Sequence, residues 1–254
     1  MDQTPCNPKD CANKTLEFRG SRTVNVKQMQ TSVGRITACL TVCADGMKLP
    51  PLLVFKDQPG ASVEKEVQKF PEGCKYICQA NAWTDERVIL YWVDNVLRPY
   101  VEKAPKNVVP YLLLDKYTCH YQGTVAKAIE ALGVEWDIIP GGCTGLVQPI
   151  DIGIGKPWKN RVRYRFEDWQ MEQTSWDRVS TKTVRALLAK YALESWNRVP
   201  RDVVYNAWRH KPYSYFPEED TRPTEFQDDD FQSSDEEDED EDEEDDTHTQ
   251  TASI

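Results

Sequence analysis

A strand–helix–strand pattern between residues 108 and 139 constrains the fold of this chain more than any other feature. Residues 108–114 form a short apolar run, typical of a strand buried on both faces, which ends at Asp115. Residues 124–132 carry apolar side chains at helical spacing, and Gly133 follows as a stop signal. Residues 134–139 have the composition of a second strand. Strands joined by such a crossover are parallel, which predicts an α/β fold.

Further elements are predicted on both sides of this unit. Residues 1–34 are polar and irregular, and residues 57–80 are expected to form a loop. The sequence predicts strands over residues 35–44 and 49–56 with a hairpin turn at Asp45-Gly46, a helix over 84–103, a long helix from about Asp151 to 173, and a helical segment over 181–208.

The net charge of −11 conceals an uneven distribution along the chain. Residues 218–246 contain 19 acidic side chains and one arginine, whereas residues 152–217 contain 13 basic and 6 acidic ones. We expect one folded domain over residues 1–217 and a disordered acidic tail over 218–254, because so charged a segment cannot bury apolar surface. The basic segment keeps nucleic acid open as a partner. No apolar run suits a membrane span, and no signal peptide is recognisable, so no membrane partner is expected.

The eight cysteines are interpreted as reduced thiols of an intracellular protein. Their spacings are C-x4-C once and C-x3-C twice, without the C-x2-C pair common in zinc sites. With no secretory segment, buried apolar thiols are favoured over disulfides and over zinc.

Three aspartates are candidates for one catalytic site. Asp115 ends a predicted parallel strand, where ligands gather in α/β sheets, and Asp151 precedes the long helix 36 residues later. Asp2 lies at the start of the chain. Clustered carboxylates repel one another unless a cation lies between them, and oxygen ligands favour Mg²⁺ or Mn²⁺. Taken singly, Asp115, Asp151 and Asp2 have simpler interpretations as a turn residue, a helix cap and a frayed terminus.

Several motifs in order resemble the DDE transposase domain of the pogo group, which includes the Tigger, jerky and centromere-binding-protein relatives. They are Met1-Asp-Gln-Thr-Pro5, Lys14-Thr-Leu-Glu17, Thr23-Val-Asn-Val26, Arg35-Ile-Thr37, Ala44 to Lys56, Leu112-Leu-Leu-Asp115 with His120, and Gln148 to Lys159. The resemblance spans residues 1 to about 216, and the order and spacing of several motifs make it specific.

This resemblance implies a ribonuclease-H-like fold, with a mixed central sheet flanked by helices and a C-terminal helical extension. It also implies that Asp2, Asp115 and Asp151 are the catalytic acids that hold two Mg²⁺ or Mn²⁺ ions for DNA cleavage and strand transfer. The expected partners are DNA, a second copy of the chain and, for the acidic tail, basic chromatin proteins. The expected location is the nucleus, as for a protein of transposable-element origin.

Two departures from the family pattern affect these expectations. Lys116 follows the second acid where the family commonly has asparagine, and this cation either weakens metal binding or points away. The chain also begins one residue before Asp2, so we expect an incomplete first strand and no upstream helix-turn-helix module. These features favour an alternative function, a catalytically inactive relic or a domesticated chromatin protein, whereas the intact acids favour the enzyme.

The long helix combines an apolar stripe with basic residues. Lys156, Lys159 and Arg163 share one helical face, flanked by Arg161 and Arg165. These five residues are predicted to bind the DNA backbone, and the alternative is an ordinary solvated face. His120 is interpreted as a structural residue or a proton shuttle.

Overall fold

The computed structural model describes residues 1–7, 36–173, 179–210 and 214–216, all within one compact unit, Met1–Asp220. The prediction that residues 1–34 are irregular is wrong for Asp2–Cys6, which pair with a later segment as a strand, and residues 8–34 lie outside the described residues. The predicted acidic tail lies entirely outside the described residues. Among the described helices, none is long and apolar enough to cross a membrane.

The larger sheet contains four strands in chain order: β1 (Asp2–Cys6), β2 (Ile36–Leu40), β3 (Leu52–Lys56) and β4 (Lys75–Gln79). The first three strands are antiparallel neighbours, and β4 is parallel to β3. The predicted hairpin between β2 and β3 is confirmed, with Gly46 at its turn at a φ of +86°. A left-handed backbone of this kind favours glycine.

The predicted strand–helix–strand unit is confirmed as β5 (Tyr111–Leu114), α4 (Gly123–Glu130) and β6 (Glu135–Ile138), with parallel strands. The prediction that β5 is buried on both faces is wrong at the start of the strand, because the Tyr111 side chain is 58% exposed. The Met1 nitrogen donates to the Leu113 carbonyl oxygen at 2.9 Å. The beginning of β1 therefore lies beside β5. The parallel pair β5–β6 thus adjoins the antiparallel strands at β1.

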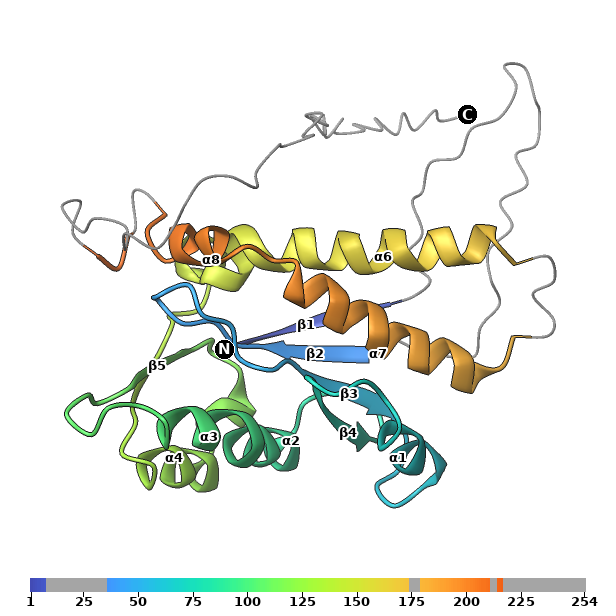
Figure 1. The fold of residues 1–254 in the computed structure, drawn as a ribbon. Helices are drawn as coiled ribbons and strands as arrows, with labels where there is room; N and C mark the ends of the chain where they lie inside the picture. Colours follow the sequence, from blue (N-terminus) through green and yellow to red (C-terminus); the bar gives the residue numbers. More distant parts are fainter. Residues whose placement is uncertain (8–35, 174–178, 211–213, 217–254) are drawn as a thin grey trace, which may run out of the picture. The chain divides into compact units, whose positions relative to one another are not determined.

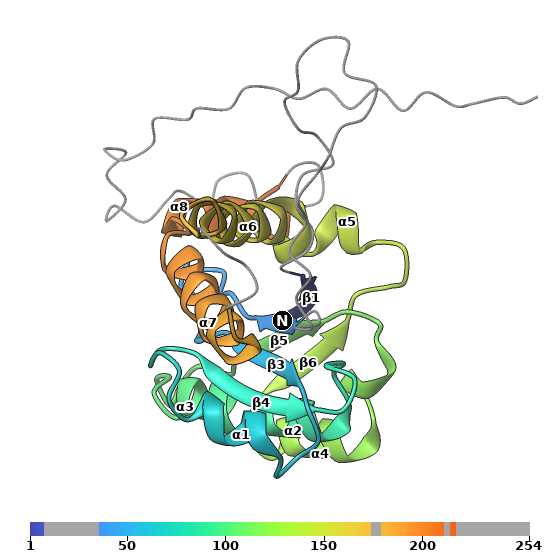
Figure 2. The same cartoon turned by 90° about the vertical axis from the view of Figure 1, so that its right-hand side faces the viewer.

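Helices cover both faces of the strands (Figures 1 and 2). One face packs against α6 (Gly155–Met171), α7 (Thr181–Asn197) and α8 (Arg201–Ala207). The other packs against α2 (Glu86–Trp92), the π-helix η1 (Val93–Leu97), α3 (Arg98–Val101) and α4. Strand residues alternate between the two cores: Ala38 and Leu40 join the first, and Cys39 joins the second. This mixed sheet flanked by helices, with a helical C-terminal part, confirms the predicted fold class.

The prediction that residues 57–80 form a loop is wrong. This segment contains α1 (Ser62–Val67) as well as β4. Helix α1 has less than two turns, and only Val63 and Val67 are buried, so its sequence shows too little periodicity to stand out. The predicted helix over residues 181–208 is divided into α7 and α8 at Pro200, which is the N-cap of α8.

The segment between β6 and α6 positions the candidate site. It contains the short helix α5 (Thr144–Val147) and the π-helix η3 (Ile150–Ile154), which leads directly into α6. The predicted apolar stripe of the long helix is confirmed, since Ile154, Trp158, Val162 and Phe166 are buried. Between β5 and α4, a single 3₁₀ turn, η2 (Thr118–His120), follows the second acid.

The cysteines support the core-thiol interpretation. Five of the seven described cysteines are buried, and the seven are free thiols. Burial raises the pKa of the Cys39 and Cys74 thiols, the second to about 12, as expected for thiols in apolar surroundings.

Candidate active site

The three predicted acids come from separate segments that meet where β1 lies beside β5. Asp2 is the first residue of β1 and is 6% exposed. Asp115 directly follows β5, and Asp151 lies in η3 with an exposed side chain. The carboxyl groups of Asp2 and Asp151 are hydrogen-bonded to each other, and both interact electrostatically with Asp115. The fold thus makes neighbours of three acids that are far apart in the sequence.

The acids shift one another's protonation. Burial and then the Asp151 charge raise the pKa of Asp2 from 3.8 to about 7, and Asp115 adds to this effect. Partial desolvation and then the Asp115 charge raise the pKa of Asp151, whereas Lys159 and the hydrogen bond with Asp2 oppose that rise. Such shifts show that these carboxylates repel in the folded chain. A cation placed among them relieves that repulsion.

The donor set fits a hard divalent cation in its chemistry. Asp115 Oδ1 is buried, and its 2.6 Å approach to His120 Nδ1 lacks the geometry of a hydrogen bond. Carboxylate oxygens are the ligands that Mg²⁺ and Mn²⁺ prefer. In the part of the chain that the structure describes, no group of three His, Cys, Asp or Glu side chains is arranged so that it could hold a metal ion. Binding therefore requires the carboxylates to move toward a common centre.

His120 lies beside the second acid and is fully buried. Its Nδ1 is 2.6 Å from Asp115 Oδ1 and 3.3 Å from the Asp115 carbonyl oxygen. Its Nε2 contacts the Gln3 amide nitrogen, and Thr84 Oγ1 donates to Gln3 Oε1. Sequence reasoning missed Gln3 and Thr84, although Gln3 directly follows the first acid. Thr84 was interpreted only as part of a helix start, where the cap is Asp85.

Lys116 points away from the acids. It is exposed, and its Cδ lies close to Gly141, in the loop that follows β6. It is absent from the charges that shift the pKa values of Asp2 and Asp151. The departure from the family pattern at this position therefore leaves the acidic cluster without a competing cation there.

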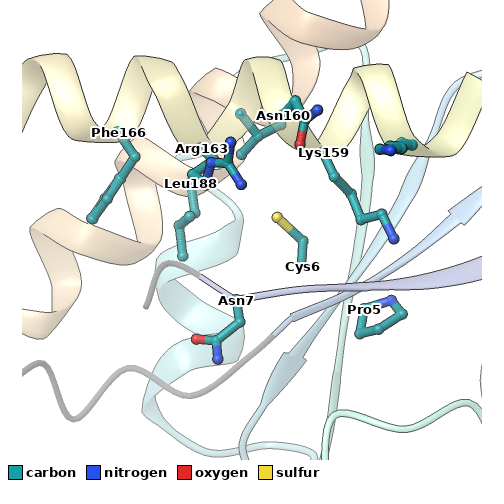
Figure 3. A pocket seen from close by; sticks show the side chains of 10 residues that line it. Pro5, Cys6, Asn7, Lys159, Asn160, Arg163, Phe166 and Leu188 are labelled. Atoms are coloured by element: carbon teal, nitrogen blue, oxygen red, sulfur yellow. The ribbon is translucent and has the colours of Figure 1, made fainter. Parts of the chain in front are cut away.

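Three of the five predicted DNA-binding residues face β1. Lys156, Lys159 and Arg163 line a cavity of about 230 Å³ between α6, the end of β1 and α7. Figure 3 shows Lys159 and Arg163 above Cys6, the last residue of β1. Because Lys159 also lowers the pKa of Asp151, the cationic side of α6 extends to the acids.

The other two basic residues lie in a different environment. Arg165 Nη2 is 2.6 Å from Glu194 Oε2 on α7, and the Arg165 guanidinium lies 5.6 Å from the centre of the Tyr191 ring. Arg161 lines a separate pocket together with Arg165 and Glu194. The structure thus divides the five predicted residues into a group of three beside β1 and a group of two beside α7.

Comparison with known proteins agrees with this arrangement. The family model for the DDE superfamily endonuclease matches residues 34–208, more than two thirds of the chain. The chain belongs to the DDE superfamily endonuclease family. The matched region contains Asp115, Asp151 and the whole of α6.

Relatives of this endonuclease domain include two curated proteins named "Pogo transposable element with KRAB domain", from Mus musculus and Homo sapiens. Each is 27% identical over 214 residues, which cover 82% of this chain and 34% of the relative. The chain therefore spans about a third of the length of these relatives. A solved Mos1 transposase paired-end complex with left transposon end is 15% identical, with a TM-score of 0.33 over 81% of this chain and 54% of that chain. The family match and the pogo relatives confirm the resemblance predicted from the motifs.

Proposed function

We propose that this domain cleaves DNA phosphodiester bonds with the help of divalent metal ions and transfers the cut strand, as a transposon-derived endonuclease. The observation that carries this proposal is that Asp2, Asp115 and Asp151, far apart in the sequence, lie close enough in a DDE-family fold for their charges to act on one another. The nuclear location and DNA as partner follow from the same proposal.

The three carboxylates would hold the metal ions. Bound Mg²⁺ or Mn²⁺ ions in pairs activate a water or a 3′ hydroxyl and stabilise the leaving oxygen in phosphodiester chemistry. Asp2 is fixed by its place in the β1–β2 ladder, opposite Leu40. Asp115 is held next to buried His120, and the Asp151 side chain is exposed. Two acids are therefore anchored by their neighbours, and the third is accessible to solvent.

The cationic side of α6 would bind the DNA backbone next to the acids. Lys156, Lys159 and Arg163 project toward β1, and the strand leads from their cavity to Asp2. Five residues of β-strand span roughly 13 Å between first and last Cα. A DNA strand lying along β1 thus passes from the cations to the carboxylates. Phosphate contacts of this kind position the substrate without reading its sequence.

Nicking of a supercoiled plasmid in Mn²⁺ tests the proposal. We expect the wild-type chain to nick the plasmid slowly and without sequence preference, and Asp115→Asn to abolish nicking while the protein stays folded. Lys159→Ala should weaken DNA binding and lower the slope of log affinity against log salt by about one. Arg165→Ala is the matched control, because its cation is paired with Glu194.

Nicking that persists unchanged in Asp115→Asn would show that the activity comes from elsewhere. Absence of nicking in the wild type, together with no detectable Mn²⁺ binding, would refute the enzymatic proposal. Equal losses of DNA affinity in Lys159→Ala and Arg165→Ala would mean that the side of α6 facing β1 has no special role.

A further inference from the structure

A row of polar side chains, buried at Thr84 and His120, leads from the start of α2 to the second acid. Thr84 is 5% exposed, and its hydroxyl donates to Gln3 Oε1. The Gln3 amide nitrogen contacts His120 Nε2, and His120 Nδ1 faces Asp115. The four residues come from three places in the fold: β1, the residue before the α2 cap, and the segment after β5.

The direction of the hydrogen bonds along this row is fixed by chemistry. Carboxylate and carbonyl oxygens only accept, so the proton of a neutral imidazole must be on Nδ1, which faces the Asp115 oxygens 2.6 and 3.3 Å away. Nε2 then accepts with its lone pair from the Gln3 amide nitrogen. The opposite tautomer would place a lone pair on Nδ1 against a carboxylate oxygen. The Asp115 end thus requires the Nδ1–H tautomer, and the Gln3 amide is oriented to match it.

We infer that His120 is a positioning residue for the second acid, held in its Nδ1–H tautomer by Gln3 and Thr84. The ring orients the Asp115 carboxyl group toward Asp2 and Asp151. Gln3 adds a connection, because its neighbour in β1 is the first acid. The row therefore ties the positions of two acids together. This inference rests on the proposed function for its consequence, though not for its geometry.

The surroundings of His120 limit its freedom to do anything else. The ring is 0% exposed and lies edge-on to Tyr117, with ring centres 5.7 Å apart. Both ring nitrogens have partners, so neither is available to a substrate. Partners that orient metal ligands typically change metal affinity or activity roughly 10- to 100-fold when removed. We expect an effect of that size through Asp115.

The first experiment reads the tautomer directly. The chain contains three histidines, His120, His210 and His248, so long-range ¹⁵N–¹H spectra of the metal-free protein are simple to assign. We expect a protonated Nδ1 and an unprotonated Nε2 for His120. A His120 protonated only on Nε2 would overturn the inference. This readout does not depend on activity or on metal.

The second experiment measures Mn²⁺ affinity by calorimetry. His120→Phe keeps a ring but loses the donor, and we expect it to bind Mn²⁺ roughly 10- to 100-fold more weakly. His120→Asn keeps an N–H donor and should recover much of that loss. Gln3→Met and Thr84→Val should shift the tautomer of His120 and weaken Mn²⁺ binding less than His120→Phe does. His210→Asn, at an exposed position, is the matched control.

The outcomes separate this inference from the proposed function. Thermal unfolding of each variant first establishes that it is folded. If the wild type binds no Mn²⁺, the proposed function fails, and the tautomer alone decides the inference. If the wild type binds Mn²⁺ and His120→Phe binds it equally well, the positioning role is refuted while the proposed function survives.

Discussion

Replacing the first acid by its amide should stabilise the metal-free protein at neutral pH. Asp2 is buried beside two other carboxyl groups, so its ionised form is costly in the folded state. The amide side chain introduced by Asp2→Asn is uncharged at every pH. In metal-free buffer, the free energy of unfolding of Asp2→Asn relative to wild type should therefore depend on pH.

The magnitude follows from the pKa of Asp2, which is 3.8 for the free side chain and about 7 in the folded protein. Well below pH 3.8 the carboxyl group is protonated in both states, and the two proteins differ by a constant. As pH rises toward 7, the unfolded wild type releases a proton that the folded wild type retains, so wild type loses stability relative to Asp2→Asn. Each pKa unit corresponds to about 1.4 kcal/mol, so the change approaches about 4 kcal/mol above pH 7.

The assay is urea unfolding of both proteins with EDTA between about pH 4 and 8, with exposed Asp94→Asn as control. Adding Mn²⁺ at about pH 8 should stabilise wild type and leave Asp2→Asn nearly unchanged, because binding to the folded state adds stability. A stability difference that stays flat across this pH range would refute the argument that Asp2 is buried against like charges.

Three further predictions concern packing, backbone and the tail. Trp158→Ala should destabilise the domain by about 3–5 kcal/mol in urea unfolding, since this fully buried indole fills the space between α6 and the sheet. Gly46→Ala should cost about 1–3 kcal/mol, because φ is +86° and a Cβ there would lie 2.6 Å from Arg201 Cγ; an unchanged midpoint would contradict the described hairpin. Removing the tail after Pro217 should raise nonspecific DNA affinity at low salt, with the gain shrinking as salt rises, because the acidic tail competes with phosphates for the same cations. Equal DNA affinities with and without the tail at both salts would contradict that competition.

Long apolar patterns made much of the fold predictable. The parallel β5–α4–β6 unit was marked by an apolar run, a helical repeat and a glycine stop, the β2–β3 hairpin by its Asp45-Gly46 turn, and α6 by apolar side chains at helical spacing. Helix α1 and strand β4 were not predictable, because each contributes only two buried apolar side chains to a core supplied mainly by other elements. Their positions depend on contacts with partners distant in sequence.

The candidate site, like the fold, was predictable only in part. Asp115 and Asp151 could be proposed because each ends or begins a recognisable element, whereas Asp2 was proposed through the resemblance of the motifs to the family. The polar row behind Asp115 could not, because Thr84 and Gln3 are 81 residues apart and meet only when β1 joins the sheet beside α2. Likewise, helical spacing alone does not reveal that Arg165 is paired with Glu194 of α7.

The most direct test of the three-acid site is an anomalous difference map from crystals of this chain soaked in Mn²⁺. The three-acid site predicts one or two peaks, with at least one peak about 2.1 Å from carboxylate oxygens of Asp2, Asp115 and Asp151. Two ions acting together should lie about 3.5–4 Å apart. Peaks that involve fewer than two of these acids, or no peak beside them in crystals that bind Mn²⁺ elsewhere, would contradict it.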